Sequence, residues 1–142
     1  MREILFRGKR ISDGKWVYGA FCEFDVDVTE DGDLLVIPHS SIIDYSDELL
    51  WNEVDPETVG QYTGLTDKNG KKIFEGDIVP IVRRPDYFDY AGVDYNALIT
   101  FAKGGFCITN GKLGLLCQAV NMGDFEVIGN IHDNPELLEV KP

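Results

Sequence analysis

Tight-turn dipeptides divide this chain into short apolar segments, and this punctuation constrains the fold more than any other feature. Asp13-Gly14, Asp31-Gly32, Asn69-Gly70 and Asn110-Gly111 each separate two runs rich in β-branched, aromatic or other apolar residues. Such dipeptides favour β-hairpins because Gly, Asn and Asp adopt the positive φ angles that type I′ turns require. The sequence therefore predicts a mainly β protein.

The strand pattern extends from this punctuation. We expect a first hairpin over residues 4–24 and a second over residues 24–37 that ends at Pro38. Residues 40–53 have the composition of a short helix, and Pro135 suits the first position of a one-turn helix. Pro80 predicts an edge strand or a bulge, because proline cannot donate to a ladder.

These segments together predict the architecture. Short strands joined by tight turns indicate a small, bent, SH3-like β-barrel with an N-terminal β-hairpin region and one or two short helical turns. The 142 residues fit one domain, residues 1–142. A subdivision into a hairpin region, residues 1–50, and a barrel, residues 51–142, is left open.

The negative charge is concentrated in one part of the chain. The net charge is −12, and residues 16–67 contain thirteen acidic residues and no Lys or Arg. Nucleic-acid binding depends on Lys and Arg that displace counterions from phosphates. Direct binding is therefore disfavoured, and an SH3-like nucleic-acid binder would need four cations on one face: Arg83, Arg84, Lys103 and Lys112.

The N-terminus and the cysteines indicate a cytoplasmic protein. Charged residues occupy the place of a signal peptide's apolar stretch, and no apolar run approaches the roughly 20 residues of a membrane span. The cysteines, Cys22, Cys107 and Cys117, are odd in number and form no CxxC pair. We expect no membrane association, disulfide framework or zinc knuckle.

Three blocks of sequence share one family resemblance. They are residues 2–19 (REILFRGKRISDGKWVYG), residues 55–79 (DPETVGQYTGLTDKNGKKIFEGDIV) and residues 125–138 (FEVIGNIHDNPELL). Together, and in this order, they resemble the YopX family of bacteriophage and prophage proteins. His132 departs from the family pattern, which places an aromatic residue there, commonly tyrosine.

The resemblance implies a mainly β fold, an origin in a phage or an integrated element, and a bacterial host cytoplasm as the location. The family has no established molecular function, so no catalytic residue carries over. We expect the motif residues to be structural: Gly60, Gln61, Thr63, Gly64, Asp67, Gly70, Glu75, Gly76, Asp77, Gly129, Asn130 and Asn134.

The titratable residues do not form a recognised catalytic or metal motif. Glu75 and Asp77 flank a glycine, and an aspartate before a strand commonly accepts bonds from nearby backbone N–H groups. His39 and His132 lack the spacing that places two metal ligands on one face. A hydrolase or metal enzyme that uses both histidines remains an alternative, but we expect no enzyme, cofactor or metal site.

An aromatic segment is the best candidate for a contact surface. Tyr87, Phe88, Tyr90 and Tyr95 lie in a segment without periodicity, interrupted by aspartates, although their rings could instead pack on the protein's own barrel. We therefore predict a non-enzymatic module that binds another protein or forms a homo-oligomer. The alternative is an acidic phage protein that occupies a basic, nucleic-acid-binding surface of a host factor through residues 23–57.

Overall fold

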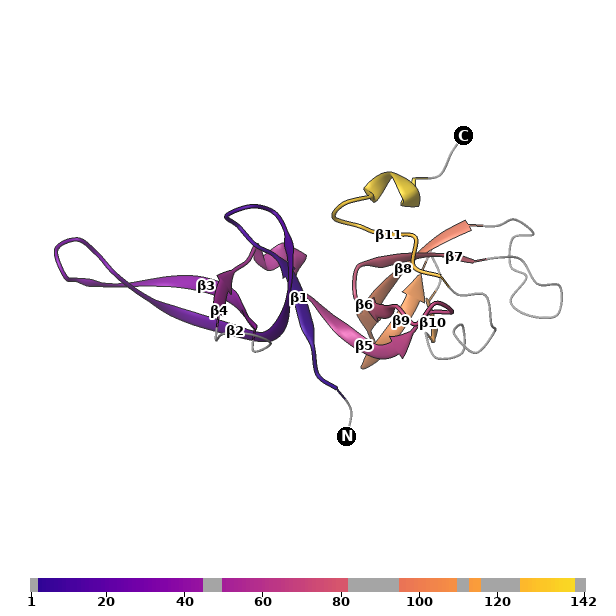
Figure 1. The fold of residues 1–142 in the computed structure, drawn as a ribbon, viewed down its shortest axis with the longest axis horizontal. Helices are drawn as coiled ribbons and strands as arrows, with labels where there is room; N and C mark the ends of the chain where they lie inside the picture. Colours follow the sequence, from indigo (N-terminus) through magenta and orange to yellow (C-terminus); the bar gives the residue numbers. More distant parts are fainter. Residues whose placement is uncertain (1–2, 45–49, 82–94, 110–112, 116–125, 140–142) are drawn as a thin grey trace. The chain divides into compact units, whose positions relative to one another are not determined.

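A computed structural model of the protein describes residues 3–44, 50–81, 95–109, 113–115 and 126–139. The chain divides into two compact units, Met1–Gln61 and Tyr62–Pro142. Strand β5, Gly60–Thr66, contains the boundary, so one continuous strand belongs to both units (Figure 1). In the described ranges no helix has the length and apolar character required to cross a membrane.

Unit 1 is an antiparallel sheet with the strand order β4-β3-β2-β1 and the start of β5 beside β1. The Arg10–Lys15 turn joins the first two strands, with Gly14 at a φ of 70°. Its elements are β1 (Phe6–Lys9), β2 (Trp16–Val28), β3 (Leu34–Asp44), β4 (Leu50–Glu53) and the 3-10 turn η1 (Pro56–Thr58).

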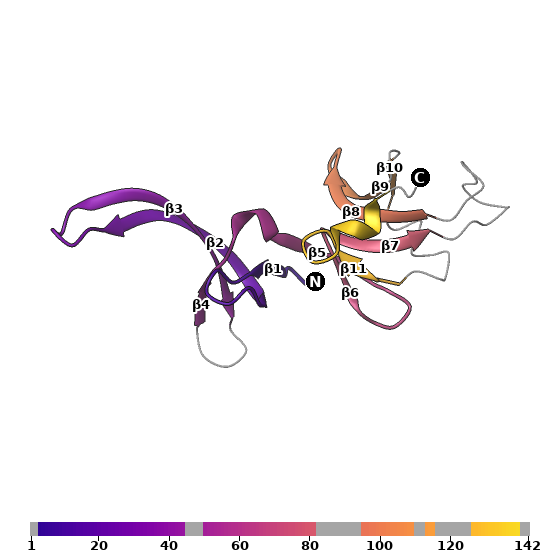
Figure 2. The ribbon, with the colours of Figure 1, turned by 90° about the horizontal axis from the view of Figure 1, so that it is seen from above.

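Strands β2 and β3 continue well beyond β1 and β4 (Figures 1 and 2). We call residues 24–39 the outer ribbon. Their ladder runs to the pair Val28↔Leu34, and the turn is closed by the Thr29 N–H, which donates to the Asp33 carbonyl at 2.9 Å. The predicted second hairpin is thus present, but its strands are longer than expected.

The expected end of a strand at Pro38 is wrong. Strand β3 passes through Pro38 to Asp44, because the register shifts there and leaves the proline outside the regular pairing between Val26↔Val36 and Phe24↔His39. The helical prediction for residues 40–53 is also wrong for residues 40–44 and 50–53, which are strand. The β-branched Ile42 and Ile43 are buried there, and this burial favours a strand.

Gly19 permits the close packing of β2 against β3. A Cβ atom at this position would lie 1.9 Å from the carbonyl oxygen of Ile43, which is much closer than two such atoms can approach. The buried residues of unit 1 include Ile42, Val54 and the polar Asn52. The inner end of the β2–β3 pair is therefore the packed part of unit 1.

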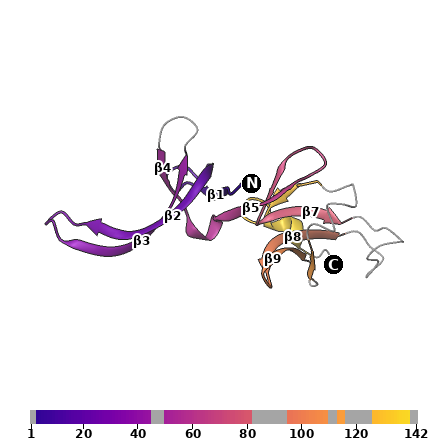
Figure 3. The ribbon, with the colours of Figure 1, turned by 90° about the horizontal axis from the view of Figure 1, so that it is seen from below.

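Unit 2 contains a hairpin and a five-stranded antiparallel sheet with the order β10-β9-β8-β7-β11. Asn69-Gly70 lies in the hairpin turn between β5 and β6, as the sequence predicts. Figure 3 shows β7, β8 and β9 side by side. The elements are β6 (Lys72–Phe74), β7 (Asp77–Ile81), β8 (Tyr95–Ala102), β9 (Gly105–Thr109), β10 (Leu113–Leu115), β11 (Gly129–Asn130) and the 3-10 turn η2 (Pro135–Leu138).

The core of unit 2 is formed by buried aliphatic side chains from separate strands, with Leu65, Ile81 and Phe106 packed around them. Full burial of a valine or isoleucine side chain contributes about 1.5–3 kcal/mol. Pro80 pairs with Asn96 of β8, while β11 covers only Asp77 and Ile78 on the other side, so among the described strands Pro80 lies at a local edge. The buried members are Ile73, Val79, Ala97, Ile99, Ile108 and Val127.

The mainly β fold is confirmed, and its two short helical turns are η1 and η2, the latter with Pro135 at its start. The described strands form antiparallel sheets without a closed barrel, so the SH3-like barrel stays a prediction. The single domain over residues 1–142, and its subdivision after residue 50, also stay predictions.

Candidate interaction surface

The predicted aromatic contact residues fall largely outside the described part of the chain. Tyr87, Phe88 and Tyr90 lie outside it. Tyr95 is the first residue of β8 and pairs with Ile81, but only its backbone is described. The contact role of these four residues therefore stays a prediction.

Exposed aromatic residues that the sequence did not single out lie on one face of unit 1. The register places Ala20, Ile43 and Trp51 opposite one another across β2, β3 and β4, and directly opposed residues share a face. Tyr18 lies two residues before Ala20 on β2, so it shares this face. Tyr18 and Trp51 are 45% and 53% exposed.

Trp16 extends this face and carries two cations. The Arg7 guanidinium lies 4.6 Å from the centre of the Trp16 ring, and the Lys9 ammonium lies 5.6 Å from it. Arg7 is buried, whereas Lys9 is partly exposed. A cation over an aromatic ring is stabilised by the ring quadrupole, more strongly where water is excluded. We call Trp16, Tyr18 and Trp51 the aromatic face.

A smaller aromatic pair lies on the β8–β9 hairpin of unit 2. Phe101 and Phe106 pair across the strands with their rings edge to face and 5.3 Å between centroids, and Phe101 is 53% exposed. The turn between them contains Lys103, which has a φ of 51°. Of the proposed nucleic-acid-binding cations, only Lys103 is described; Arg83, Arg84 and Lys112 lie outside the described residues.

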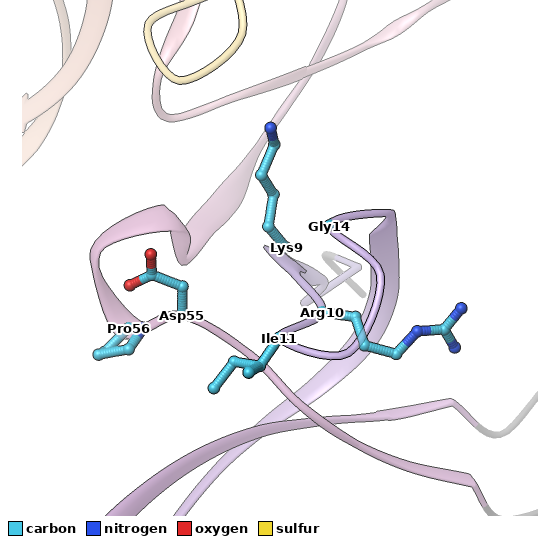
Figure 4. A pocket seen from close by; sticks show the side chains of 6 residues that line it. All are labelled: Lys9, Arg10, Ile11, Gly14, Asp55 and Pro56. Carbon is cyan, nitrogen blue, oxygen red and sulfur yellow. The ribbon is translucent and has the colours of Figure 1, made fainter.

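A surface hollow of about 410 Å³ lies beside the first turn of unit 1 (Figure 4). Its lining residues contain no histidine, cysteine or serine. Asp55 accepts a hydrogen bond from the Glu57 N–H at 3.0 Å and caps η1. The hollow is therefore lined by side chains of both charges, with Lys9 and Arg10 cationic and Asp55 anionic. Its lining is Lys9, Arg10, Ile11, Gly14, Asp55 and Pro56.

Arg10 at this hollow is bound to the neighbouring turn. Its Nε and a terminal nitrogen donate to the two carboxylate oxygens of Asp13 at 2.9 and 2.6 Å. The bonds from Arg10, together with one from the Lys15 N–H, lower the pKa of Asp13 to about 2. The Arg10 guanidinium is thus held on the Asp13 side and is also bonded to Asn52 at 3.0 Å.

The outer ribbon presents negative charge without cations. Glu23, just before it, and Asp25 within it are exposed at alternate positions of β2. The ribbon's turn adds further exposed carboxylates, and no Lys or Arg in the described part of the chain forms an ion pair with any of them. These turn residues are Glu30, Asp31 and Asp33.

Asp67 of the family motif is a buried structural carboxylate. One of its oxygens accepts from the N–H groups of Asn69 and Lys71, both at 2.9 Å, and the other accepts from the Val127 N–H at 3.1 Å. Burial raises the pKa of Asp67, but the three N–H donors and the nearby Lys71 outweigh it and leave the pKa below its ordinary value. Asp67 thus closes the Asn69-Gly70 turn and joins it to the C-terminal segment.

The other residues of the middle motif lie around the same hairpin. The Thr63 hydroxyl donates to the Ile73 carbonyl at 2.8 Å, and the buried Asp77 carboxylate accepts from the Phe74 N–H at 2.8 Å. The Gly76 N–H donates to the Ile99 carbonyl, while the Gly76 carbonyl accepts from Ile131. Gly64, Gly70 and Gly76 have φ angles of 87°, 80° and 90°, which favour glycine. Gly60 and Gln61 pair with β1, and Glu75 lies in the turn before β7.

The C-terminal motif organises the chain before η2. The Asn130 side-chain oxygen accepts from the N–H groups of His132 and Asp133 at 3.0 and 2.9 Å. The Asn134 side chain accepts from the Asn130 N–H at 3.3 Å and fills the space beside Gly129. The regular pairing of this segment with β7 is at Gly129–Asn130, strand β11.

The two histidines have separate surroundings. His39 Nδ1 lies 3.0 Å from Glu53 Oε1 in unit 1, and His132 is exposed in the Asn130 turn of unit 2. Among the described residues no group of three or more His, Cys, Asp or Glu side chains could hold a metal ion. The hydrolase alternative that uses both histidines stays an untested hypothesis.

Comparison with known proteins gives a family and a fold. The sequence model of the family described as YopX protein matches residues 5–139. A crystal structure of protein EF1440 from Enterococcus faecalis is similar, with a TM-score of 0.54, 23% identity, and coverage of 98% of this chain and 100% of that chain. No curated protein matches. At this identity the structural similarity shows the fold alone.

Proposed function

Since this chain belongs to the YopX family, we propose that it is a non-enzymatic protein of a bacteriophage or prophage that binds another protein or assembles with copies of itself. It acts in the cytoplasm of the bacterial host and needs no cofactor. The predicted segment with Tyr87, Phe88, Tyr90 and Tyr95 contributes to the contact.

The exposed aromatic face of unit 1 is the observation that carries this proposal. Large rings bury much apolar area at low entropic cost and are enriched where proteins bind one another. Trp51 and Tyr18 share one sheet face, and both are about half exposed. Single exposed apolar residues are ordinary, but rings gathered on one sheet face favour a contact surface.

Native mass and partner capture test the proposal. We would measure light scattering of the full chain and its capture of proteins from host lysate, then repeat both with Trp51→Ser and with Tyr87→Ser/Phe88→Ser/Tyr90→Ser. We expect at least one of these variants to weaken assembly or capture at least tenfold. Ile4→Ser is the control, since Ile4 is 64% exposed but lies outside the strands. A strictly monomeric wild type that captures nothing would refute the proposal.

A second candidate function is supported by the charge of the outer ribbon and its neighbours. Exposed carboxylates without nearby described cations suit a protein that occupies a basic, nucleic-acid-binding surface of a host factor. Charge reversal within residues 23–57 should then weaken binding to such a factor, and the binding should fall as salt rises. Unchanged binding after charge reversal would remove this candidate.

A further inference from the structure

The outer ribbon leaves one edge of β2 open. Strand β1 pairs with β2 only from Trp16 to Gly19, and no described strand pairs with the outward edge of residues 23–28. Alternate residues of such an edge present backbone N–H and C=O groups away from β3. An isolated two-stranded ribbon is marginally stable in water, so a third strand would stabilise it. We call residues 23–28 the open edge.

The charge of the open edge selects its occupant. Glu23 and Asp25 alternate along β2, and the nearby turn is acidic as well. A second copy that paired edge to edge would bring carboxylates close to carboxylates, and like charges across a strand pair are destabilising. Nucleic acid is also negatively charged, so the carboxylates of the open edge would repel it. A strand with Lys or Arg at alternate positions would instead place opposite charges across the pair.

We propose that the open edge binds an extended, cationic segment of a partner protein by adding it to the sheet as a strand. The backbone bonds supply the pairing, and the Lys or Arg side chains supply the selectivity. The inference rests on the proposed protein-binding function. It names residues 23–28 as the contact and a basic, strand-forming segment as the ligand.

A competing explanation gives the same residues a protective role. Proteins keep strand edges from pairing by placing charges and bulges on them, and the ladder shifts register between Phe24 and Val26. An edge protected in this way would bind no strand. A direct measurement of strand binding therefore distinguishes the two explanations.

The probe is a fluorescent ten-residue peptide of alternating lysine and valine, and anisotropy measures its binding to the full chain. We expect saturable binding that weakens at least tenfold between 50 and 200 mM salt, because the contact is charged. Glu23→Lys/Asp25→Lys should weaken binding at least tenfold. The control Glu136→Lys/Glu139→Lys changes the net charge equally at exposed sites of unit 2, and should change binding less than twofold.

A second peptide keeps the test independent of variant folding. Methylation of alternate backbone nitrogens removes N–H donors and keeps every lysine, so wild-type protein should bind this peptide at least tenfold more weakly. Equal affinity for the two peptides, or equal losses in the two charge variants, would mean attraction to net charge alone and would overturn the proposal. No binding of the first peptide would identify a protected edge and would overturn it too.

Light scattering separates this inference from the proposed function. A wild-type dimer that Glu23→Lys/Asp25→Lys dissociates would identify a second copy as the occupant, which refutes the cationic partner but supports assembly. Failed peptide binding with assembly or capture still sensitive to Trp51→Ser would refute the open edge alone. Circular dichroism should show that both charge variants retain the wild-type β spectrum.

Discussion

The Asp67 carboxylate accepts a hydrogen bond from the backbone N–H of Val127, which lies 60 residues later in the chain. The same carboxylate closes its own turn through the N–H groups of Asn69 and Lys71. One side chain therefore links a local hairpin to the C-terminal segment. Asp67 lies in the middle of the three family-like blocks, residues 55–79, and has this double structural role there.

Asp67→Asn should destabilise unit 2 by about 1–3 kcal/mol, because an amide nitrogen cannot accept the hydrogen bonds that one carboxylate oxygen accepts. Thermal or urea unfolding at neutral pH measures the loss. Asp25→Asn is the control, since Asp25 is exposed and should change stability by less than about 0.5 kcal/mol. Equal stability of the two variants would contradict the role of Asp67.

The pH dependence of stability should also change in Asp67→Asn. The folded pKa of Asp67 lies below its ordinary value, so its stabilisation is present above the unfolded pKa of about 3.9 and is lost as the pH falls through the folded pKa. Melting temperatures between pH 6 and pH 2 should therefore fall less steeply in the variant than in the wild type. An identical acid dependence in both proteins would exclude this linkage.

The pKa of Asp13 should be measurable as a local property of the first turn. Nuclear magnetic resonance titration of the wild type should give a value of about 2, owing first to the hydrogen bonds from Arg10. In Arg10→Gln the value should rise toward the ordinary value of about 3.9. A pKa that stays near 2 in this variant would assign the shift to the Lys15 N–H instead.

Gly19→Ala should destabilise unit 1 by about 1–3 kcal/mol, because the added Cβ would collide with the Ile43 carbonyl and force β2 and β3 apart. Gly105→Ala is the matched control, since a Cβ there meets no atom within 4 Å. Chemical unfolding of both variants checks the difference. If Gly105→Ala costs as much as Gly19→Ala, the close approach at Gly19 is not the cause.

Arg7→Gln should destabilise unit 1 by about 2 kcal/mol, because a buried cation is removed from the Trp16 ring. Lys9→Gln removes the more distant and more exposed cation, so it should cost about 0.5–1 kcal/mol. In a Trp51→Phe background the fluorescence of Trp16 reports the change directly. A larger spectral change in Lys9→Gln than in Arg7→Gln would mean that Lys9, and not Arg7, is the main cation at the Trp16 ring.

Turn chemistry made much of the fold predictable from sequence. Asp13-Gly14 and Asn69-Gly70 both lie in hairpin turns, because their glycines adopt the positive φ that few other residues tolerate. Pro135 begins η2 for the same local reason, since its φ and missing N–H suit that position. Local conformational preferences determine these positions, and they are visible in a few residues.

The predictions from sequence are wrong where tertiary packing overrides local conformational preference. Residues 40–44 have a helix-like composition, but Ile42 and Ile43 are buried between β2 and β4. Pro38 is tolerated because the register shift removes the need for a donor there. The aromatic face was missed for a similar reason, since the alignment of Trp51 with Ile43 and Ala20 depends on a long-range register that no local pattern specifies.

Strand β5 has a consequence for any attempt to produce the two halves separately. Its first residues are the neighbour of β1, and its last residues are the partner of β6. A fragment that ends at residue 59 would leave β1 with an uncovered side, and one that begins at residue 67 would leave β6 alone. Each half can be studied in isolation only if Gly60–Thr66 is included in both fragments.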